Sequence, residues 1–270
     1  MKQKPDIQLQ YEGFLNTPLL WKSKPFEELN QFEISPTAIT SFDQLTPVKI
    51  RLGKLVERFV SCELRLQKSI SIINENLQII EDKLTIGELD CLLRHFNQII
   101  HLEISYKFYL YDENAGKLES ERWIGPNRRD SLKQKLSKLK SKQLPTLFHK
   151  ETIRTLEKID IDVSDIIQLV YFKAQLFVPY PIKPRLLPEI NNDCIKGFYI
   201  QKIQLKQFND YSFYIPSKMN WIVDLHNNVN WIGFNDFLPE LTELLNNKKS
   251  PLCWLKDSKG NIEKIFVVWW

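Results

Sequence analysis

The sequence predicts a mixed α/β protein, and two observations indicate this fold class. Three strand-like segments, at 74–80, 85–94 and 98–111, follow one another with short polar connections. Segments before and after them carry apolar residues at the spacing of an amphipathic helix. Short connections favour antiparallel neighbours, because parallel strands need a crossover of roughly a dozen residues or more. We therefore expect an antiparallel meander flanked by helices.

The other elements are predicted in chain order. Residues 1–45 are punctuated by prolines and predict an irregular arm. A helix is expected from Lys49 to about Ile70, and another from about 128 until Pro145 stops it. The remaining expectations are a helix at 151–158, a strand at 166–181, a helix at 234–247 and a terminal strand at 264–270. The terminal segment is strongly apolar, so we expect its strand to occupy a central or covered position.

Composition excludes several classes of protein. The chain has 270 residues, 43% of them apolar and 26% charged, as is usual for a globular protein. Glycines number 8 and form neither a P-loop nor a dinucleotide fingerprint, so no nucleotide cofactor is expected. The 4 cysteines are widely spaced, which favours free thiols in a reducing cytoplasm. No signal peptide or membrane span is expected.

Charged residues interrupt the second and third predicted strands. Glu88 and Asp90 share one face of their strand, and Glu103 shares a face with Lys107 on the next, because side chains alternate. Carboxylates are ligands for Mg²⁺ or Mn²⁺, and a lysine can orient water and stabilise a phosphoryl oxygen. Alternatively, these charges mark the solvated side of an antiparallel sheet, with ordinary cross-strand ion pairs.

The order of these elements resembles the core of the PD-(D/E)xK nuclease superfamily. Within it, the segments "GELD", "HLEISYKFYL", "WIGPNRRDSLKQKL" and "FVVWW" are similar to a bacterial family called domain of unknown function 1853. The resemblance covers most of the chain. It implies a restriction-endonuclease-like mixed sheet flanked by helices at 46–180, with an N-terminal arm at 1–45. A C-terminal α/β extension at 181–270 would pack on this core.

The resemblance also implies roles for single residues. Asp90 matches the metal-binding aspartate of the second strand, and Lys107 matches the lysine of the third. Ser105 stands where an acid is expected two residues before that lysine, and Glu103 lies two residues further back. At a rise of ~3.3 Å per residue, Glu103 and Lys107 are ~13 Å apart along a strand. The chain therefore departs from the pattern at this position.

Three explanations of that departure stay open. Glu103 reaches a metal that lies off-centre, or a second carboxylate comes from Glu88 or Glu57, or the site no longer cuts. Glu57 matches a helix acid that many such nucleases place beside the metal, and an exposed helical glutamate is the alternative. The expected catalytic residues are Asp90, Glu103 and Lys107. The expected metal ligands are Asp90, Glu103, Glu88 and Glu57.

A basic segment follows the third strand. Seven lysines and arginines and one acid lie between Arg128 and Lys142, and such a segment can neutralise phosphates without reading sequence. The alternative is a solvated helix face. The expected contacts to nucleic acid are Arg128, Arg129, Lys133, Gln134, Lys135 and Lys138, with Gln143 as a weaker candidate. The net charge of +4 is compatible with that partner.

The leading hypothesis is a divalent-metal-dependent nuclease that acts on DNA or RNA. A catalytically inactive nuclease-fold module that binds nucleic acid is the second hypothesis, and a protein-interaction scaffold is the third. The 7 tryptophans are interpreted as core or interface groups, and the 4 histidines, which lack metal-ligand spacing, as structural. The oligomeric state, the strandedness of the substrate and any sequence preference are left open.

Overall fold

The computed structural model describes residues 6–35, 41–43, 47, 49–182 and 189–270. These residues form two compact units, each assembled from distant parts of the chain. The hairpin unit comprises the described residues of Leu19–Tyr106 and Gln134–Lys173. The C-terminal unit comprises those of Met1–Pro18, Lys107–Lys133 and Ala174–Trp270. Within the described part of the chain, every helix is too short or too polar to cross a bilayer.

Six α-helices and nine strands make up the described regular structure, together with short 3₁₀ and π segments. The helices are α1 (Asp6–Leu15), α2 (Leu52–Arg65), α3 (Glu119–Arg122), α4 (Leu132–Lys138), α5 (Lys150–Glu157) and α6 (Phe234–Asn246). The strands are β1 (Ile70–Glu81), β2 (Leu84–His95), β3 (Gln98–Tyr111), β4 (Trp123–Ile124), β5 (Ile166–Pro179), β6 (Ile195–Gln201), β7 (Ser212–Tyr214), β8 (Leu252–Lys256) and β9 (Ile262–Val268).

The strands belong to one mixed sheet. Its order is β1-β2-β3-β5-β6-β9-β8-β7, and β4 pairs with β3 outside this path. Strand β6 runs parallel to both β5 and β9, whereas β1–β2–β3 and β7–β8–β9 are antiparallel. The predicted mixed α/β class and the predicted meander are therefore confirmed. The terminal strand lies between β6 and β8, as its apolar sequence predicts.

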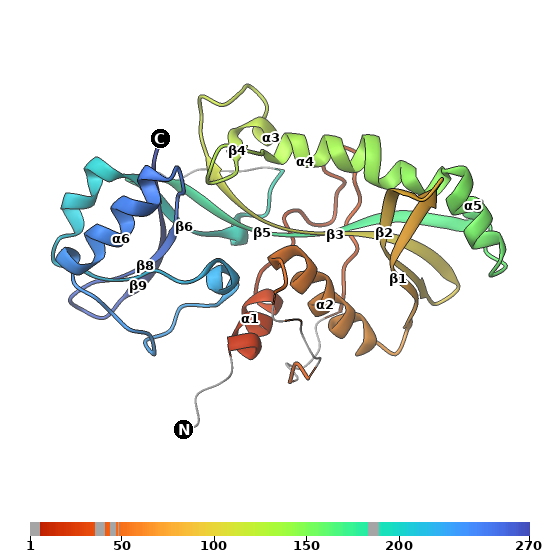
Figure 1. Cartoon of the computed structure of the whole chain (residues 1–270), viewed down its shortest axis with the longest axis horizontal. Coiled ribbons are helices and arrows are strands. Elements are labelled where there is room, and N and C mark those ends of the chain that lie inside the picture. The colour runs from red at the N-terminus through yellow and green to blue at the C-terminus, as the bar shows by residue number, and fades with distance from the viewer. Residues whose placement is uncertain (1–5, 36–40, 44–46, 48, 183–188) are drawn as a thin grey trace. The chain divides into compact units, whose positions relative to one another are not determined.

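The hairpin unit is built around β1, β2 and β3. Two residues, Asp82 and Lys83, connect β1 to β2, and both have positive φ, at 46° and 69°. Two consecutive left-handed residues give the turn whose twist matches that of the flanking strands. Figure 1 shows α4 and α5 along one side of these strands and α2 along the other. Helix α2 buries Leu55, Phe59 and their apolar neighbours, as its spacing predicts.

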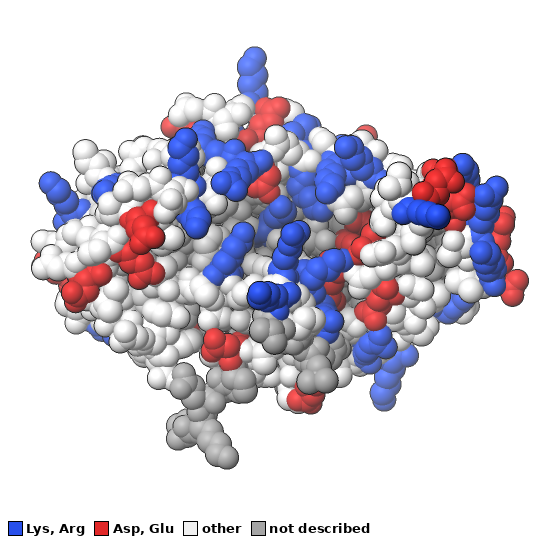
Figure 2. Space-filling view, viewed as in Figure 1, with Lys and Arg blue, Asp and Glu red and all other residues white. Residues whose placement is uncertain are grey.

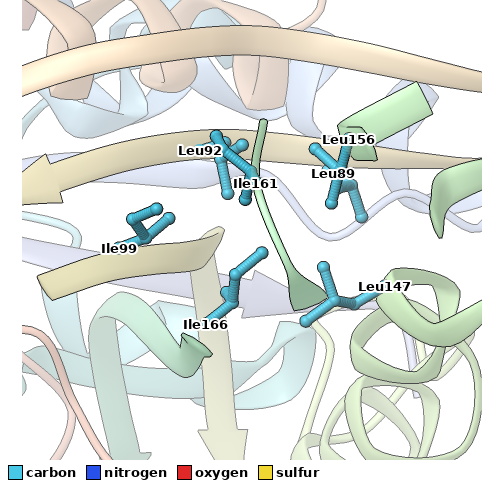
Figure 3. Close-up of a cluster of buried hydrophobic side chains, with 7 residues drawn as sticks. All are labelled: Leu89, Leu92, Ile99, Leu147, Leu156, Ile161 and Ile166. Carbon is cyan, nitrogen blue, oxygen red and sulfur yellow. The ribbon is translucent and has the colours of Figure 1, made fainter. Parts of the chain in front are cut away.

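A cluster of aliphatic side chains fills the space between the strands and the helical segments of this unit. Its members come from β2, β3, α5, the start of β5 and the segments beside them (Figure 3). They are Leu89, Leu92, Ile99, Leu147, Leu156, Ile161 and Ile166, and none is more than 9% exposed. Burial of this apolar surface stabilises the unit by about 25 cal/mol for each Å² removed from water.

The C-terminal unit brings α1 against a segment more than two hundred residues further along the chain. Gly13 of α1 lies so close to this segment that a Cβ there would stand 2.1 Å from the carbonyl oxygen of Ile222. Only glycine fits such an approach without a shift of the backbone. Elsewhere in the unit, Phe213 of β7 stacks on Phe237 of α6 with ring centroids 4.2 Å apart. The approach of Gly13 to Ile222 thus brings the N-terminal and C-terminal parts of the chain together within one unit.

Two expectations about local structure were wrong, and some short strands were missed. The predicted irregular arm contains α1, because Tyr11 and Phe14, one turn apart, are both fully buried. Pro145 does not end the helical chain: a π segment at Leu139–Gln143 passes directly into a 3₁₀ segment at Leu144–Phe148. Proline is tolerated there because the first residues of a helical segment do not need their N–H groups. Strands β7 and β8 were not predicted, since β7 has only three residues.

Adjacent isoleucines at the start of β5 provide a test of the aliphatic cluster. Ile166→Ala is expected to lower the free energy of unfolding by about 2–5 kcal/mol, because Ile166 is 8% exposed and its truncation leaves a cavity. Ile167→Ala is the matched control, since Ile167 is 46% exposed, and should cost less than about 1 kcal/mol. Urea unfolding of both variants measures the difference, and equal losses would contradict this assignment of the core.

Candidate metal centre

The hairpin of β2 and β3 brings Asp90 and Glu103 next to each other. The strands pair from His95↔Gln98 to Cys91↔Leu102, and the two acids occupy the next position on each strand. The Oδ2 atom of Asp90 accepts a hydrogen bond from the backbone N–H of Ile104 at 2.9 Å. Glu103 is completely buried. The interpretation of these charges as a solvated face therefore does not hold at Glu103.

Both carboxylate oxygens of Glu103 have partners inside the hairpin unit. The Nε2 atom of Gln143 donates to Oε2, and the Nε2 atom of His101 lies 3.1 Å from Oε1. The other ring nitrogen of His101 lies 2.9 Å from Nε2 of Gln168, which also donates to the carbonyl of Leu144 at 2.6 Å. A buried carboxylate needs such donors, because an uncompensated charge in the interior is strongly unfavourable.

Lys135 connects helix α4 to the same network. Its Nζ donates to Oε1 of Gln143 at 2.7 Å, so Gln143 bridges the ammonium of Lys135 and the carboxylate of Glu103. The positive charge of Lys135 also favours the ionised form of Asp90. Lys135 was predicted to contact nucleic acid. The structure places it beside the buried carboxylates.

Asp90 is the most perturbed acid of the group. Burial, together with the neighbouring charge of Glu103, raises the pKa of Asp90 from 3.8 to about 7. The hydrogen bond from Ile104 opposes both effects. The two carboxylates therefore resist being charged together in the absence of a cation. This is the electrostatic condition in which a bound divalent ion is most favourable.

Glu57, Glu88 and Asp90 form a cluster with metal-binding dimensions. One carboxylate oxygen from each can be chosen so that all three lie within 4.8 Å of one another. They come from α2 and β2, and each is partly exposed, so an ion has access from solvent. Carboxylate oxygens are the ligands that Mg²⁺ and Mn²⁺ take in proteins. The residues present thus fit a hard divalent cation.

Lys54 lies among these acids. Its Nζ donates to Oε2 of Glu57 and to Oδ1 of Asn76, each at 2.8 Å, and also to Oε1 of Glu88. Burial nevertheless raises the pKa of Glu57, because the loss of hydration outweighs the attraction of the ammonium. Lys54 is thus a tethered cation that neutralises part of the cluster. A metal ion would compete with it for the same oxygens.

Lys107 and Ser105 have different surroundings. The Nζ atom of Lys107 donates to Oδ2 of Asp130 at 2.7 Å, within the C-terminal unit. The hydroxyl of Ser105 is buried and makes no hydrogen bond to the described residues. The lysine expected to orient water is therefore ion-paired with an acid 23 positions further along the chain. That aspartate was not among the predicted site residues.

The residues predicted to contact nucleic acid do not share one environment. Arg128 precedes α4 and is paired with Asp112 at 2.6 Å. It is exposed, as are Arg129, Gln134 and Lys138, whereas Lys133 is half-buried. Figure 2 shows lysines and arginines spread over the face in view, with acids among them. Most of the predicted basic set is thus exposed, whereas Lys135 contacts the network around Glu103.

Sequence reasoning missed Lys54, His101 and Gln168. Two of them had a local signal: Lys54 lies one helical turn before Glu57, and His101 shares a strand face with Glu103 by alternation. Gln168 had none, because it lies 67 positions from His101 in the chain. Contacts of that kind depend on tertiary packing, and no spacing rule identifies them.

The fold and the site together define a class: a mixed α/β protein with a partly exposed acidic cluster beside its antiparallel hairpin, whose dimensions could accommodate a metal ion. A family model described as Domain of unknown function (DUF1853) matches residues 7–268, so the chain belongs to that family. No curated protein and no solved structure matches the chain.

The raised pKa of Asp90 predicts how stability depends on pH. A carboxyl whose pKa is higher in the folded state contributes stability that is full below pH 3.8 and is lost as pH rises through about 7. In EDTA, the thermal midpoint of the wild type should therefore fall relative to that of Asp90→Asn between pH 5 and pH 8, by about 2–4 °C per kcal/mol. Scanning calorimetry measures it.

Asp210→Asn is the control for this pH series, because it removes an exposed aspartate outside the acidic cluster. Its midpoint should follow that of the wild type across the range. A constant difference between the wild type and Asp90→Asn at every pH would show that Asp90 does not titrate in this interval.

The position of Lys54 predicts a competition with metal. Lys54→Met is expected to bind Mn²⁺ several-fold more tightly than the wild type, because about 1 kcal/mol of ion-pair energy no longer opposes the ion. Calorimetric titration gives the two dissociation constants. Arg65→Met is the matched control, since it breaks a different ion pair, which joins Arg65 of α2 to Glu75 of β1. Unchanged or weaker binding by Lys54→Met would exclude a shared position.

Proposed function

We propose that this protein is a divalent-metal-dependent hydrolase of phosphodiester bonds in nucleic acid, with a PD-(D/E)xK-type site in its hairpin unit. The observation that carries the proposal is the pair of adjacent acids, Asp90 and Glu103, beside the acids of α2 and β2. Two like charges held together away from water are unfavourable unless a cation compensates them. A site for a metal ion explains why the chain keeps this arrangement.

The proposed roles follow the surroundings of each acid. Asp90, Glu57 and Glu88 would hold Mg²⁺ or Mn²⁺, since their oxygens converge within 4.8 Å. Glu103 would complete the ligand set by releasing Gln143 or His101. The bound ion supplies a more acidic water and stabilises charge that develops on a phosphoryl oxygen. This assignment combines two of the explanations for Ser105: Glu103 reaches the metal, and Glu57 and Glu88 supply further carboxylates.

Two lysines are candidates for orienting the attacking water. Lys107 is the expected one and would have to leave Asp130 to act. Lys135 is the second, and its support is the hydrogen bond to Gln143 together with its effect on Asp90. A lysine near a phosphoryl group stabilises negative charge that forms in the transition state. Both lysines are retained as candidates, and mutation of each distinguishes them.

The basic residues around α4 would bind the phosphate backbone. Arg129, Lys133 and Lys138 are assigned to this role, with Gln134 beside them. Arg128 is paired with Asp112 and is not assigned to the phosphate backbone. Such contacts give affinity that falls steeply with salt and carry little sequence information. DNA and RNA are both retained as substrates.

A second candidate function is an inactive nuclease-fold module that binds nucleic acid. Two observations favour it: Lys54 already neutralises Glu57 and Glu88, and both oxygens of Glu103 are engaged by protein donors. Ser105, which stands where an acid is expected, also favours an inactive module. A cluster satisfied by the protein itself needs no metal for stability.

The deciding experiment combines Mn²⁺ calorimetry with cleavage of mixed single- and double-stranded DNA and RNA in Mg²⁺ or Mn²⁺. Asp90→Asn and Glu103→Gln preserve side-chain size and should each lower the cleavage rate by at least ~100-fold, the scale expected when stabilisation of transition-state charge is removed. Both should also weaken Mn²⁺ binding. Glu75→Gln, an acid of β1 outside the cluster, is the matched control and should leave both measurements unchanged.

Lys107→Met and Lys135→Met belong to the same series. Replacement of the lysine that acts on the reacting groups should lower the rate constant at saturating substrate. Replacement of the other lysine should leave that rate constant within a few-fold of the wild type. No cleavage and no metal binding, with salt-sensitive affinity for nucleic acid in EDTA, would establish the inactive module. Absence of that affinity as well would leave the protein-interaction scaffold.

A further inference from the structure

A polar and aromatic cavity lies within the C-terminal unit, apart from every residue of the acidic cluster. Its volume is about 530 Å³, within the range of pockets that hold small molecules. Its walls come from the end of β3, the loop before α4, the ends of β5 and β6, and Trp270. Neither the metal ligands nor the lysines of the proposed nuclease site line it.

Arg128 is held in this cavity by two contacts. Its Nη2 donates to Oδ2 of Asp112 at 2.6 Å, and its guanidinium carbon lies 4.2 Å from the ring centroid of Trp270. Trp270 is fixed in turn, because its indole N–H donates to the carbonyl of Pro126 at 3.0 Å. A guanidinium has five N–H donors in a rigid fork, so a single bond to Asp112 leaves most of them for a ligand.

Aromatic rings form a second, preorganised wall. The hydroxyl of Tyr199 donates to the carbonyl of Tyr111 at 2.9 Å, and its ring centroid lies 5.6 Å from that of Trp270. Tyr180 packs on Phe198 with centroids 5.1 Å apart. Rings held in this way offer flat apolar surface to a planar ligand at little entropic cost.

The polar groups of the cavity include both donors and acceptors. Asp112 accepts from Arg128 and from the backbone N–H of Asn114, and each of its oxygens retains a second lone pair. Gln201 and Asn114 add amide side chains at the wall. The charges of Arg128 and Asp112 cancel, so the cavity has no net attraction for a highly charged anion. It suits an uncharged planar group with a hydrogen-bonding edge.

We propose that this cavity binds a single unpaired nucleobase, guanine above the others. Guanine presents two adjacent acceptors, O6 and N7, which match the fork of Arg128. It also presents two adjacent N–H groups on the neighbouring edge, which match the carboxylate of Asp112. The other common bases lack this double pair. The aromatic wall supplies the stacking surface. This binding needs no metal and does not rest on the proposed nuclease activity.

Calorimetric titration in EDTA tests the proposal with the full-length protein. The probes are GMP, AMP, CMP, UMP and ribose 5-phosphate, together with a five-nucleotide RNA that contains one guanine. GMP should bind about tenfold or more tightly than the other nucleotides, the discrimination expected of a bidentate pair, and ribose 5-phosphate should not bind. Comparison of GMP with the RNA shows whether the natural source is a free nucleotide or a base in a strand.

Two variants assign the binding to these residues. Arg128→Gln should weaken GMP binding at least about tenfold, and Asp112→Asn should abolish the preference for guanine. Arg154→Gln is the matched control, because it removes another arginine paired with an acid, at 2.7 Å, outside the cavity. Thermal midpoints show whether each variant is folded. If Arg128→Gln does not fold, Asp112→Asn decides whether these residues bind guanine.

Three results would overturn the proposal. Equal binding of ribose 5-phosphate and GMP would mean that Arg128 recognises phosphate. Failure of every nucleotide to bind would remove the ligand class altogether. Unchanged guanine preference in folded Asp112→Asn would place the recognition elsewhere. Because EDTA is present throughout, none of these outcomes depends on whether the acidic cluster binds metal or cleaves nucleic acid.

Discussion

The repulsion between Asp90 and Glu103 is the constraint on which the hairpin unit depends. A β-hairpin sets two acids side by side, and the surrounding elements remove water from them. The acids have partners from two segments: Ile104 and His101 lie on β3, and Gln143 lies after α4. Gln168 supports the ring of His101 from β5. Asp90 nevertheless keeps a pKa raised to about 7, so the compensation is incomplete. The surroundings of Asp90 and Glu103 therefore still favour the binding of a positive charge.

The helical chain from Leu132 to Phe148 makes that compensation possible. The geometry changes from α to π between Lys135 and Gln143, which are eight residues apart, and Nζ of Lys135 lies 2.7 Å from Oε1 of Gln143. A regular α-helix places such residues about two turns apart along its axis, too far for a short contact between most side chains. The same segment carries Leu147 into the aliphatic cluster. Irregular helical geometry thus links the packing of the core to the electrostatics of the site.

The sequence predicted the parts of this fold that rest on local pattern. The third strand, expected at 98–111, has those bounds in β3, because its alternation and apolar content are encoded within it. The closeness of Asp90 and Glu103 follows from the short connection between their strands. By contrast, α1 is stabilised by burial against residues near Ile222, and Lys107 finds Asp130 through tertiary structure. Local sequence patterns do not encode such distant partners, and the same limit applies to Gln168 and to the cavity around Arg128.

Two strands, β3 and β5, each begin in the hairpin unit and end in the C-terminal unit. Their backbone is continuous across the boundary, so neither unit corresponds to a segment of gene that could be duplicated, exchanged or lost by itself. A deletion that removes either strand therefore removes part of both units, whereas changes in the surface loops affect one unit at a time.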